Sequence, residues 1–113
     1  MDDCIFCKIA NKEIPSQFMY EDDKMIIIKD INPQAKYHFL AIPKKHFKDI
    51  ADIAVRSPET LCHIFKVIAE KNKELGFDNG FRVITNVGED GCQSVKHVHI
   101  HLLGGEKLSE RMG

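Results

Sequence analysis

The stretch SVKHVHIHLLGG, residues 94–105, places histidines at positions 97, 99 and 101 with apolar residues between them. Strict alternation is the period of a β-strand, in which neighbouring side chains point to opposite faces of the sheet. The pattern therefore predicts a strand whose valine, isoleucine and leucine enter a core while the three histidines line the other face. A row of imidazoles can attack, transfer protons or bind a metal, so chemistry is expected on this strand.

The sequence outside this row predicts an α+β fold. Apolar runs rich in β-branched and aromatic residues predict further strands over 17–21, 25–29, 37–42 and 81–87. Helical spacing predicts a short helix over 4–11 and a long helix from about 58 to 75, with Ser57 as its N-cap. Strands follow one another instead of alternating with helices, so we expect a five-stranded antiparallel sheet with one long and one short helix. One helix cannot cover both sheet faces, so the uncovered face is solvated, forms a ligand cleft or meets a second copy of the chain.

Length and composition limit the classes of protein. A chain of 113 residues is expected to form one domain over 1–113, with a tail over 104–113. The formal net charge of −1 gives no long-range attraction for nucleic acid. No apolar run approaches the ~20 residues of a membrane span, and the first apolar run is too short for a secretory signal. We therefore expect a cytoplasmic protein that binds neither nucleic acid nor membrane, in which four cysteines do not form a disulfide framework.

Three stretches together resemble the hallmarks of the histidine triad (HIT) family. QSVKHVHIHLL, residues 93–103, is similar to the signature His-φ-His-φ-His-φ-φ, with φ apolar, preceded by Gln-Ser-Val. DINPQAKYHFLAIPKKHF (30–47) and CIFCKIANKEIPS (4–16) resemble the two other hallmarks, in the same order. The resemblance spans Cys4 to Gly105 and points to the nucleotide-binding branch that hydrolyses adenosine 5′-phosphoramidates.

The resemblance implies four catalytic residues. His99, the middle histidine, would be the nucleophile that attacks the α-phosphorus and forms a nucleotidyl-histidine, which water then hydrolyses. His101 would donate to a phosphate oxygen, and Ser94 would lie near the leaving nitrogen, which must gain a proton. His38 would fix the orientation and tautomer of His99. The strand pattern around His38 independently predicts a buried, hydrogen-bonded ring, although a purely structural core histidine fits that pattern too.

The resemblance also implies the residues that hold a purine nucleotide. Asp30 would accept from the ribose hydroxyls, with Ile31 beside it. Asn86, Gln93 and Ser94 would hold ribose and phosphate, together with His99 and His101. Cys92 departs from the family pattern, because many relatives have glycine there and a side chain affects how closely the backbone approaches phosphate. The wall for the base would consist of Ile5, Phe6, Ile9 and Ile28, which on spacing alone could equally be core residues.

Cys4 and Cys7 form a C-x-x-C motif, and no thioredoxin-like βαβ pattern follows it. Together with His46 and His97 they form a Cys₂His₂ set, which satisfies tetrahedral Zn²⁺ and leaves no open position, so the site would be structural. Some bacterial-type family members bind zinc through the matching residues. The alternative is four unligated side chains that pack or face solvent.

Three functions remain open at this stage. The first is a hydrolase that uses a covalent histidine intermediate and needs no metal for its chemistry. The second is a metal-dependent hydrolase that uses the histidine row, although no Asp or Glu lies within that strand to complete the site. The third is a non-catalytic purine-nucleotide-binding module. For all three, the resemblance implies a homodimer joined through the long helix and a sheet edge.

Overall fold

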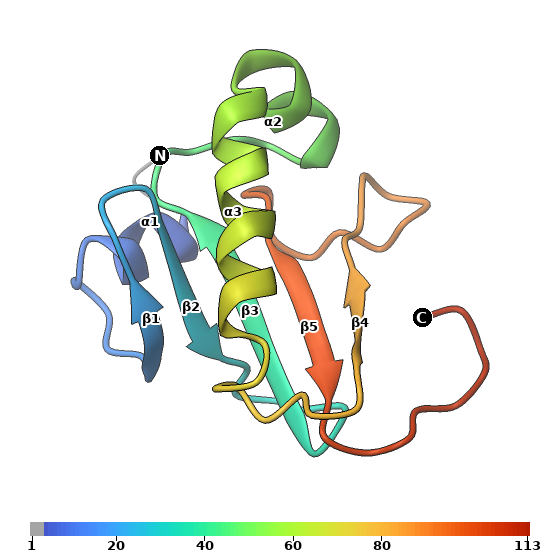
Figure 1. The fold of residues 1–113 in the computed structure, drawn as a ribbon. Coiled ribbons are helices and arrows are strands. Elements are labelled where there is room, and N and C mark those ends of the chain that lie inside the picture. Colours follow the sequence, from blue (N-terminus) through green and yellow to red (C-terminus); the bar gives the residue numbers. More distant parts are fainter. Residues whose placement is uncertain (1–3) are drawn as a thin grey trace.

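The computed structural model describes residues 4–113 and confirms the predicted α+β fold. Its five-stranded sheet has the order β1-β2-β3-β5-β4, and every neighbouring pair is antiparallel (Figure 1). The elements are α1 (Ile5–Ala10), β1 (Phe18–Glu21), β2 (Met25–Lys29), β3 (Tyr37–Pro43), α2 (Ile50–Arg56), α3 (Pro58–Lys71), β4 (Phe81–Ile84) and β5 (Ile100–Gly104).

The structure differs from the sequence-based prediction by more than one residue at an end in four elements. Helix α2 was not expected; Asp49 caps it by accepting the backbone N–H of Asp52 at 2.8 Å. Helix α3 ends at Lys71 instead of residue 75, and β4 ends at Ile84 instead of residue 87. Strand β5 begins only at Ile100, so it contains one of the three histidines.

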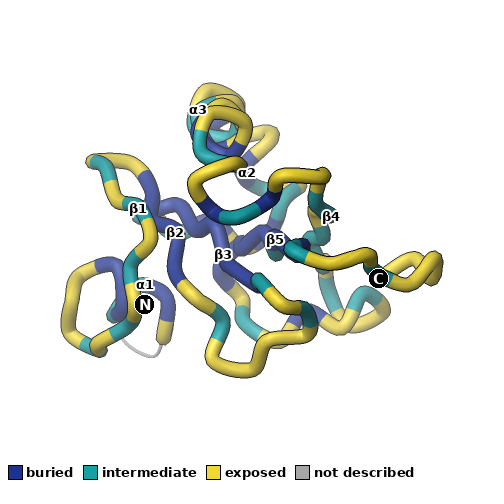
Figure 2. Tube along the Cα trace, turned by 60° about the horizontal axis from the view of Figure 1, so that its bottom comes forward, coloured by how far each residue is buried: buried dark blue, intermediate teal, exposed yellow. Residues whose placement is uncertain are grey.

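Helices cover both faces of the central strands. Figures 1 and 2 show α3 and α1 on opposite sides of the sheet. Along β2, Met25 and Ile27 pack in the core beneath α3, whereas Ile26 and Ile28 pack against α1. Because both faces of β2 are buried, its sequence is a continuous apolar run without alternation of polar residues. No helix among residues 4–113 is long and apolar enough to cross a membrane.

Asp22 fixes the turn between β1 and β2 and connects it to α3. Its Oδ1 accepts the backbone N–H groups of Lys24 at 2.8 Å and Met25 at 2.9 Å. Its Oδ2 accepts from the Tyr20 hydroxyl at 2.8 Å and lies 2.6 Å from His63 Nε2 on α3. Burial acts to raise the pKa of Asp22, but hydrogen bonds, first from His63, lower it to about 2, so the folded state favours the carboxylate.

We expect Asp22→Asn to lower the free energy of unfolding by roughly 2 kcal/mol near neutral pH, because the amide cannot replace the charged acceptor. A depressed carboxyl pKa contributes stability above the unfolded value of 3.8 that is lost as the pH falls toward 2. Urea unfolding of the wild type and Asp22→Asn should therefore show that their difference in free energy of unfolding becomes smaller as the pH falls from 3.8 toward 2. Asp23→Asn, at the exposed neighbouring position, is the control and should match the wild type. If Asp22→Asn lowers the free energy of unfolding by the same amount at every pH, the lowered pKa of Asp22 is not the cause.

Candidate active site and metal centre

The histidine row keeps its alternation of faces even though its first two histidines precede the strand. Val98, Ile100 and Leu102 lie in the core beneath α3, as predicted. Residues 97–99 leave the regular ladder because the Val98 N–H donates to the carbonyl of Phe47 at 2.7 Å, beyond the end of β3. The histidine side chains face α1, whose Phe6 ring lies 4.9 Å from the His99 ring, edge-on.

His99 is held in one tautomer. The side chain is buried, and its Nδ1 lies 2.9 Å from the carbonyl oxygen of His97. A carbonyl only accepts, so Nδ1 carries the proton, and in the neutral ring Nε2 keeps its lone pair. The Thr85 hydroxyl donates to the backbone carbonyl of His99 at 3.1 Å and fixes the backbone at this point. The ring therefore offers a nucleophilic or metal-binding nitrogen.

His101 is held in the opposite tautomer through His38. The backbone N–H of Gln34 donates to His38 Nδ1 at 3.0 Å, so this nitrogen carries no proton. In the neutral His38 ring the proton is on Nε2, which lies 2.9 Å from His101 Nδ1 and donates to it. His101 therefore carries its own proton on Nε2 and can donate to a ligand.

Burial keeps both rings of this pair neutral. It lowers the pKa of His38, and the nearby Asp30 carboxylate only partly opposes this. Burial also lowers the pKa of His101, to about 4, with further contributions from His99 and His38. Both rings are accordingly uncharged near pH 7, which the tautomer assignment requires.

The expectation that His38 orients His99 is not met by the contacts. His38 is buried and hydrogen-bonded as predicted, but its partners are the Gln34 N–H and His101. The orientation of His99 is fixed by the carbonyl of His97 instead. The reason is geometric: β3 pairs with β5 in a register that sets His38 opposite Leu103, toward the His101 end of the row.

A cleft of about 280 Å³ opens between α1 and the histidine face. It is lined by most of the predicted nucleotide-binding residues, namely Ile5, Phe6, Ile9, Ile28, Asp30, Ile31, Ser94, His99 and His101. Ile14, Pro15, Ser16, Lys29 and Leu40 also line it and were not predicted. A larger hollow of about 480 Å³, near Tyr37 and Gly105, contains no histidine. The smaller cleft therefore combines an apolar wall with the titratable groups, as expected of a ligand site.

Gln93 does not line this cleft. Its side chain is buried, and Oε1 accepts the Gly88 N–H at 3.0 Å. Its Nε2 donates to the carbonyls of Lys48 at 2.7 Å and Val95 at 2.9 Å. These three hydrogen bonds hold the loop that carries Ser94. Gln93 therefore supports the loop without lining the cleft, and both N–H groups of its amide already have acceptors.

Asn86 and Cys92 also lie outside the lining of the cleft. Asn86 donates to the carbonyl of Gly91 at 2.7 Å and closes the same loop. Cys92 is exposed and adopts the left-handed conformation, with φ of +59°, that glycine prefers. The loop therefore takes the backbone path of a glycine turn, with the extra side chain in solvent.

We expect Cys92→Gly to raise the free energy of unfolding by about 0.5–1 kcal/mol. A left-handed conformation costs a residue with a Cβ roughly 1–2 kcal/mol, and the greater freedom of glycine in the unfolded chain offsets part of the gain. Urea denaturation of the two proteins measures the difference. Cys92→Ala keeps the Cβ and removes the thiol, so it should stay at the wild-type value. If Cys92→Ala stabilises the protein as much as Cys92→Gly, the left-handed backbone conformation is not the cause of the stabilisation.

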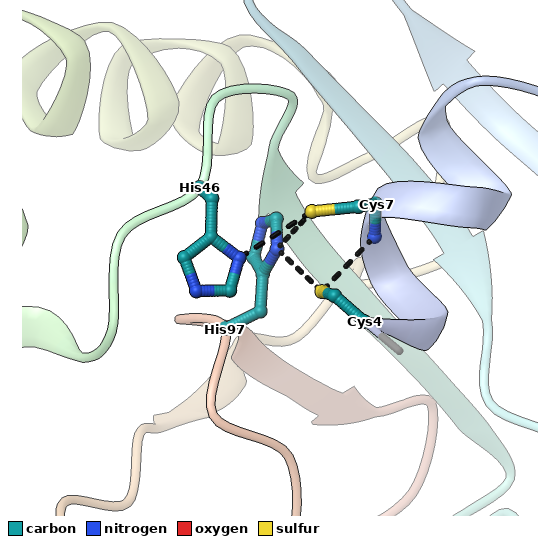
Figure 3. Close-up of side chains that lie close together, drawn as sticks. All are labelled: Cys4, Cys7, His46 and His97. Atoms are coloured by element: carbon teal, nitrogen blue, oxygen red, sulfur yellow. Dashed lines mark hydrogen bonds between the residues drawn. The ribbon is translucent and has the colours of Figure 1, made fainter. Parts of the chain in front are cut away.

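The predicted metal ligands meet at the start of α1. Figure 3 shows Cys4, the N-cap residue of α1, and Cys7, on α1, facing His97 and His46, which follows β3. Cys4 and Cys7 Sγ lie 3.2 and 3.4 Å from His97 Nδ1, and Cys7 Sγ lies 3.4 Å from His46 Nδ1. All four ligand atoms lie within 4.8 Å of one another.

The donor set fits Zn²⁺. Tetrahedral bonds of 2.0–2.3 Å put neighbouring donors about 3.3–3.8 Å apart, close to the separations found here. His97 Nε2 donates to the carbonyl of Pro43 at 2.8 Å, so its Nδ1 lone pair faces both sulfurs. Cys4 Sγ also accepts the Cys7 N–H at 3.3 Å, which orients the first sulfur. Four protein donors leave no position for substrate, so this is a structural zinc site.

Without a metal, the Cys7 thiol holds its proton. Burial, together with the adjacent Cys4 side chain, raises the pKa of Cys7 to about 11. A bound metal requires the thiolate, so metal binding would release this proton.

The comparisons with known proteins agree with this geometry. Residues 3–113 match the family described as scavenger mRNA decapping enzyme C-terminal binding. A structure of a histidine triad protein from Clostridium difficile is 51% identical, with a TM-score of 0.93, and the match covers 99% of this chain and 98% of that one. A structure of a HIT family hydrolase from Clostridium thermocellum is 41% identical, also with a TM-score of 0.93, over 99% and 98% of the two chains. A 14 kDa zinc-binding protein from Zea mays is 46% identical over 93% of this chain and 84% of its own length. This chain belongs to the histidine triad family.

Proposed function

We propose that the protein is a nucleotide hydrolase that cleaves purine nucleoside 5′-phosphoramidates, such as those of adenosine, through a covalent intermediate on His99. The observation that carries the proposal is a pair of neighbouring histidines in one cleft with opposite tautomers. His99 offers a lone pair on Nε2, whereas His101 offers a proton on Nε2. The similarity to a HIT family hydrolase supports the hydrolase class.

In the first step, Nε2 of His99 attacks the α-phosphorus and the P–N bond to the amine breaks. The imidazolium that forms keeps its proton on Nδ1, which donates to the His97 carbonyl. His101 Nε2–H donates to a non-bridging phosphate oxygen, where negative charge develops. The leaving amine takes up a proton that is relayed from solvent through the Ser94 hydroxyl, which lines the same cleft.

In the second step, water attacks the phosphorus, its surplus proton passes to solvent, and the bond to His99 breaks. This step releases the nucleoside monophosphate and returns the neutral ring. The apolar side chains on α1 and β2 would pack against the purine base and exclude water from it, and Asp30 would accept hydrogen bonds from the ribose hydroxyls.

A metal-dependent reaction at the histidine row is less well supported. Asp30, His38 and His101 do gather their ligand atoms within 4.8 Å, so a carboxylate is available after all. However, His38 Nδ1 already accepts the Gln34 N–H, so the ring proton is on Nε2, and with this bond kept Nε2 could bind a metal only after losing that proton. The cost of that deprotonation favours the metal-free mechanism.

The structural zinc site would hold α1, whose apolar side chains would contact the purine base, against the segment that carries His97. Metal binding through Cys4 and Cys7 requires reduced thiols, which supports a cytoplasmic location.

The test is incubation with adenosine 5′-phosphoramidate, followed by assay of AMP and intact mass after a quench without acid. The proposal expects turnover and a protein population heavier by one adenylyl group. A nucleotide-binding module without catalysis would bind AMP and give neither product nor adduct, which would overturn the proposal.

We also propose that the protein is a homodimer. Strand β4 is an edge strand, its Val83 is 40% exposed, and Phe65 on α3 is 42% exposed. A second copy paired along this edge would cover both side chains. Light scattering coupled to size exclusion should give twice the mass of the chain; a stable monomer at micromolar concentration would contradict dimerisation.

A further inference from the structure

We propose that Asp30 is a positioning residue for His101, in addition to any contact with ribose. On this view, the Asp30 carboxylate keeps the His38–His101 pair in the tautomer that directs a proton into the cleft. The inference rests on the proposed function, because the donated proton matters only if His101 contacts a phosphate oxygen.

Asp30 is held in place by its own local turn. Its Oδ1 accepts the Asn32 N–H at 2.8 Å, and its backbone N–H donates to the carbonyl of His38 at 3.0 Å. These bonds leave Oδ2 next to the histidine pair, 3.3 Å from His38 Nε2 and 4.0 Å from His101 Nδ1. The side chains of Asp30, His38 and His101 are only 16%, 3% and 23% exposed, so water screens this contact weakly.

A carboxylate beside His38 Nε2 discriminates between the two neutral tautomers of that ring. If Nε2 carries the proton, the proton lies near both His101 Nδ1 and Oδ2, and both interactions are attractive. If Nε2 carries a lone pair, that lone pair faces the carboxylate and is repelled. Asp30 and the Gln34 N–H, one at each ring nitrogen, therefore favour the same tautomer of His38.

The tautomer of His38 in turn determines that of His101. With His38 Nε2–H as donor, His101 Nδ1 must accept, and the only proton on the His101 ring is on Nε2. Asp30→Asn removes the charge and brings an amide N–H within reach of His38 Nε2, which favours the opposite tautomer. We therefore expect a loss of phosphate stabilisation in this variant even where ribose is not involved.

The test separates the two roles of Asp30 through the substrate. Wild type and Asp30→Asn are assayed with adenosine 5′-phosphoramidate and with its 2′,3′-dideoxy analogue, which has no ribose hydroxyl for Asp30 to bind. We expect Asp30→Asn to lower kcat by roughly 10- to 100-fold on both substrates, the range for losing an orienting partner. Wild-type kcat in Asp30→Asn on the dideoxy analogue would overturn the inference, because Asp30 would then act through ribose alone.

A second readout needs no turnover. In protein labelled with ¹⁵N-histidine, the NMR signals of His101 should report a proton on Nε2 in the wild type and mixed tautomers in Asp30→Asn. Asp23→Asn, which removes an exposed carboxylate away from the cleft, should give the wild-type spectrum. Identical His101 tautomers in the wild type and Asp30→Asn would overturn the inference. If the wild type hydrolyses neither substrate, the proposed function fails while the NMR result still decides the role of Asp30.

Discussion

His99→Gln should lower kcat for adenosine 5′-phosphoramidate by at least about 10³-fold and abolish the adenylyl adduct. Glutamine keeps an N–H that can reach the carbonyl of His97, so the buried position retains a hydrogen-bond donor. Its amide has no basic lone pair, so it cannot form the bond to phosphorus. Single-turnover assays combined with intact mass measure both effects, and AMP titration by calorimetry checks that the cleft still binds a nucleotide.

His101→Gln is the matched control for this experiment. It changes a neighbouring histidine of the same cleft but leaves the nucleophile intact, so the adduct should still form. Its kcat should fall by roughly 10²–10³-fold, the usual effect of losing one donor to a developing oxyanion. If His99→Gln folds, binds AMP and still turns over near the wild-type rate, the covalent mechanism is wrong.

The alternation in residues 94–105 was enough to predict which side chains face the core, because a period of two belongs to the β-strand. It could not predict that β5 begins at Ile100. That boundary depends on the Phe47 carbonyl, which accepts the Val98 N–H across a large sequence separation. Helix α2 was missed because it has seven residues and only one fully buried side chain, Ile53, so its apolar periodicity is weak. Its one local signal was Asp49, a good N-cap residue.

The residues that line the cleft could be predicted where they belong to a single short motif. The residues of α1 and of the histidine row meet as expected, because each lies in a short stretch with a strong pattern. The hydrogen-bond partners of Gln93 could not be predicted, because its amide can donate and accept anywhere within reach. Only the fold shows that Lys48 and Val95 take both of its N–H groups. The partner of His38 was missed for the same reason, since tautomers depend on tertiary neighbours such as the Gln34 N–H.

Loss of the metal centre should have the largest effect on stability. We expect Cys7→Ser to lose stoichiometric zinc and to melt about 15 °C below the wild type. A ligand present at 1,000 times its Kd stabilises the native state by about 4 kcal/mol, and each kcal/mol is worth roughly 4 °C in a domain of this size. Atomic absorption gives the zinc content, and calorimetry gives the melting temperature. Cys62→Ser, at an exposed position on α3, should change neither quantity.

The same variant distinguishes a structural metal from a catalytic one. Both thiols lie at the start of α1, Cys4 as its N-cap and Cys7 in its first turn. The helix also carries Phe6, which packs on His99 and lines the cleft, so release of α1 should weaken substrate binding. The tautomer of His99 depends on the backbone carbonyl of His97, and the His97 ring keeps its hydrogen bond to the Pro43 carbonyl when the metal is absent. The tautomer of His101 depends on His38, which is not a zinc ligand. Folded Cys7→Ser at low temperature should therefore show a KM raised roughly tenfold with kcat within a few-fold of the wild type. A kcat that falls with the zinc content and returns when the metal is restored would mean that the metal takes part in the chemistry.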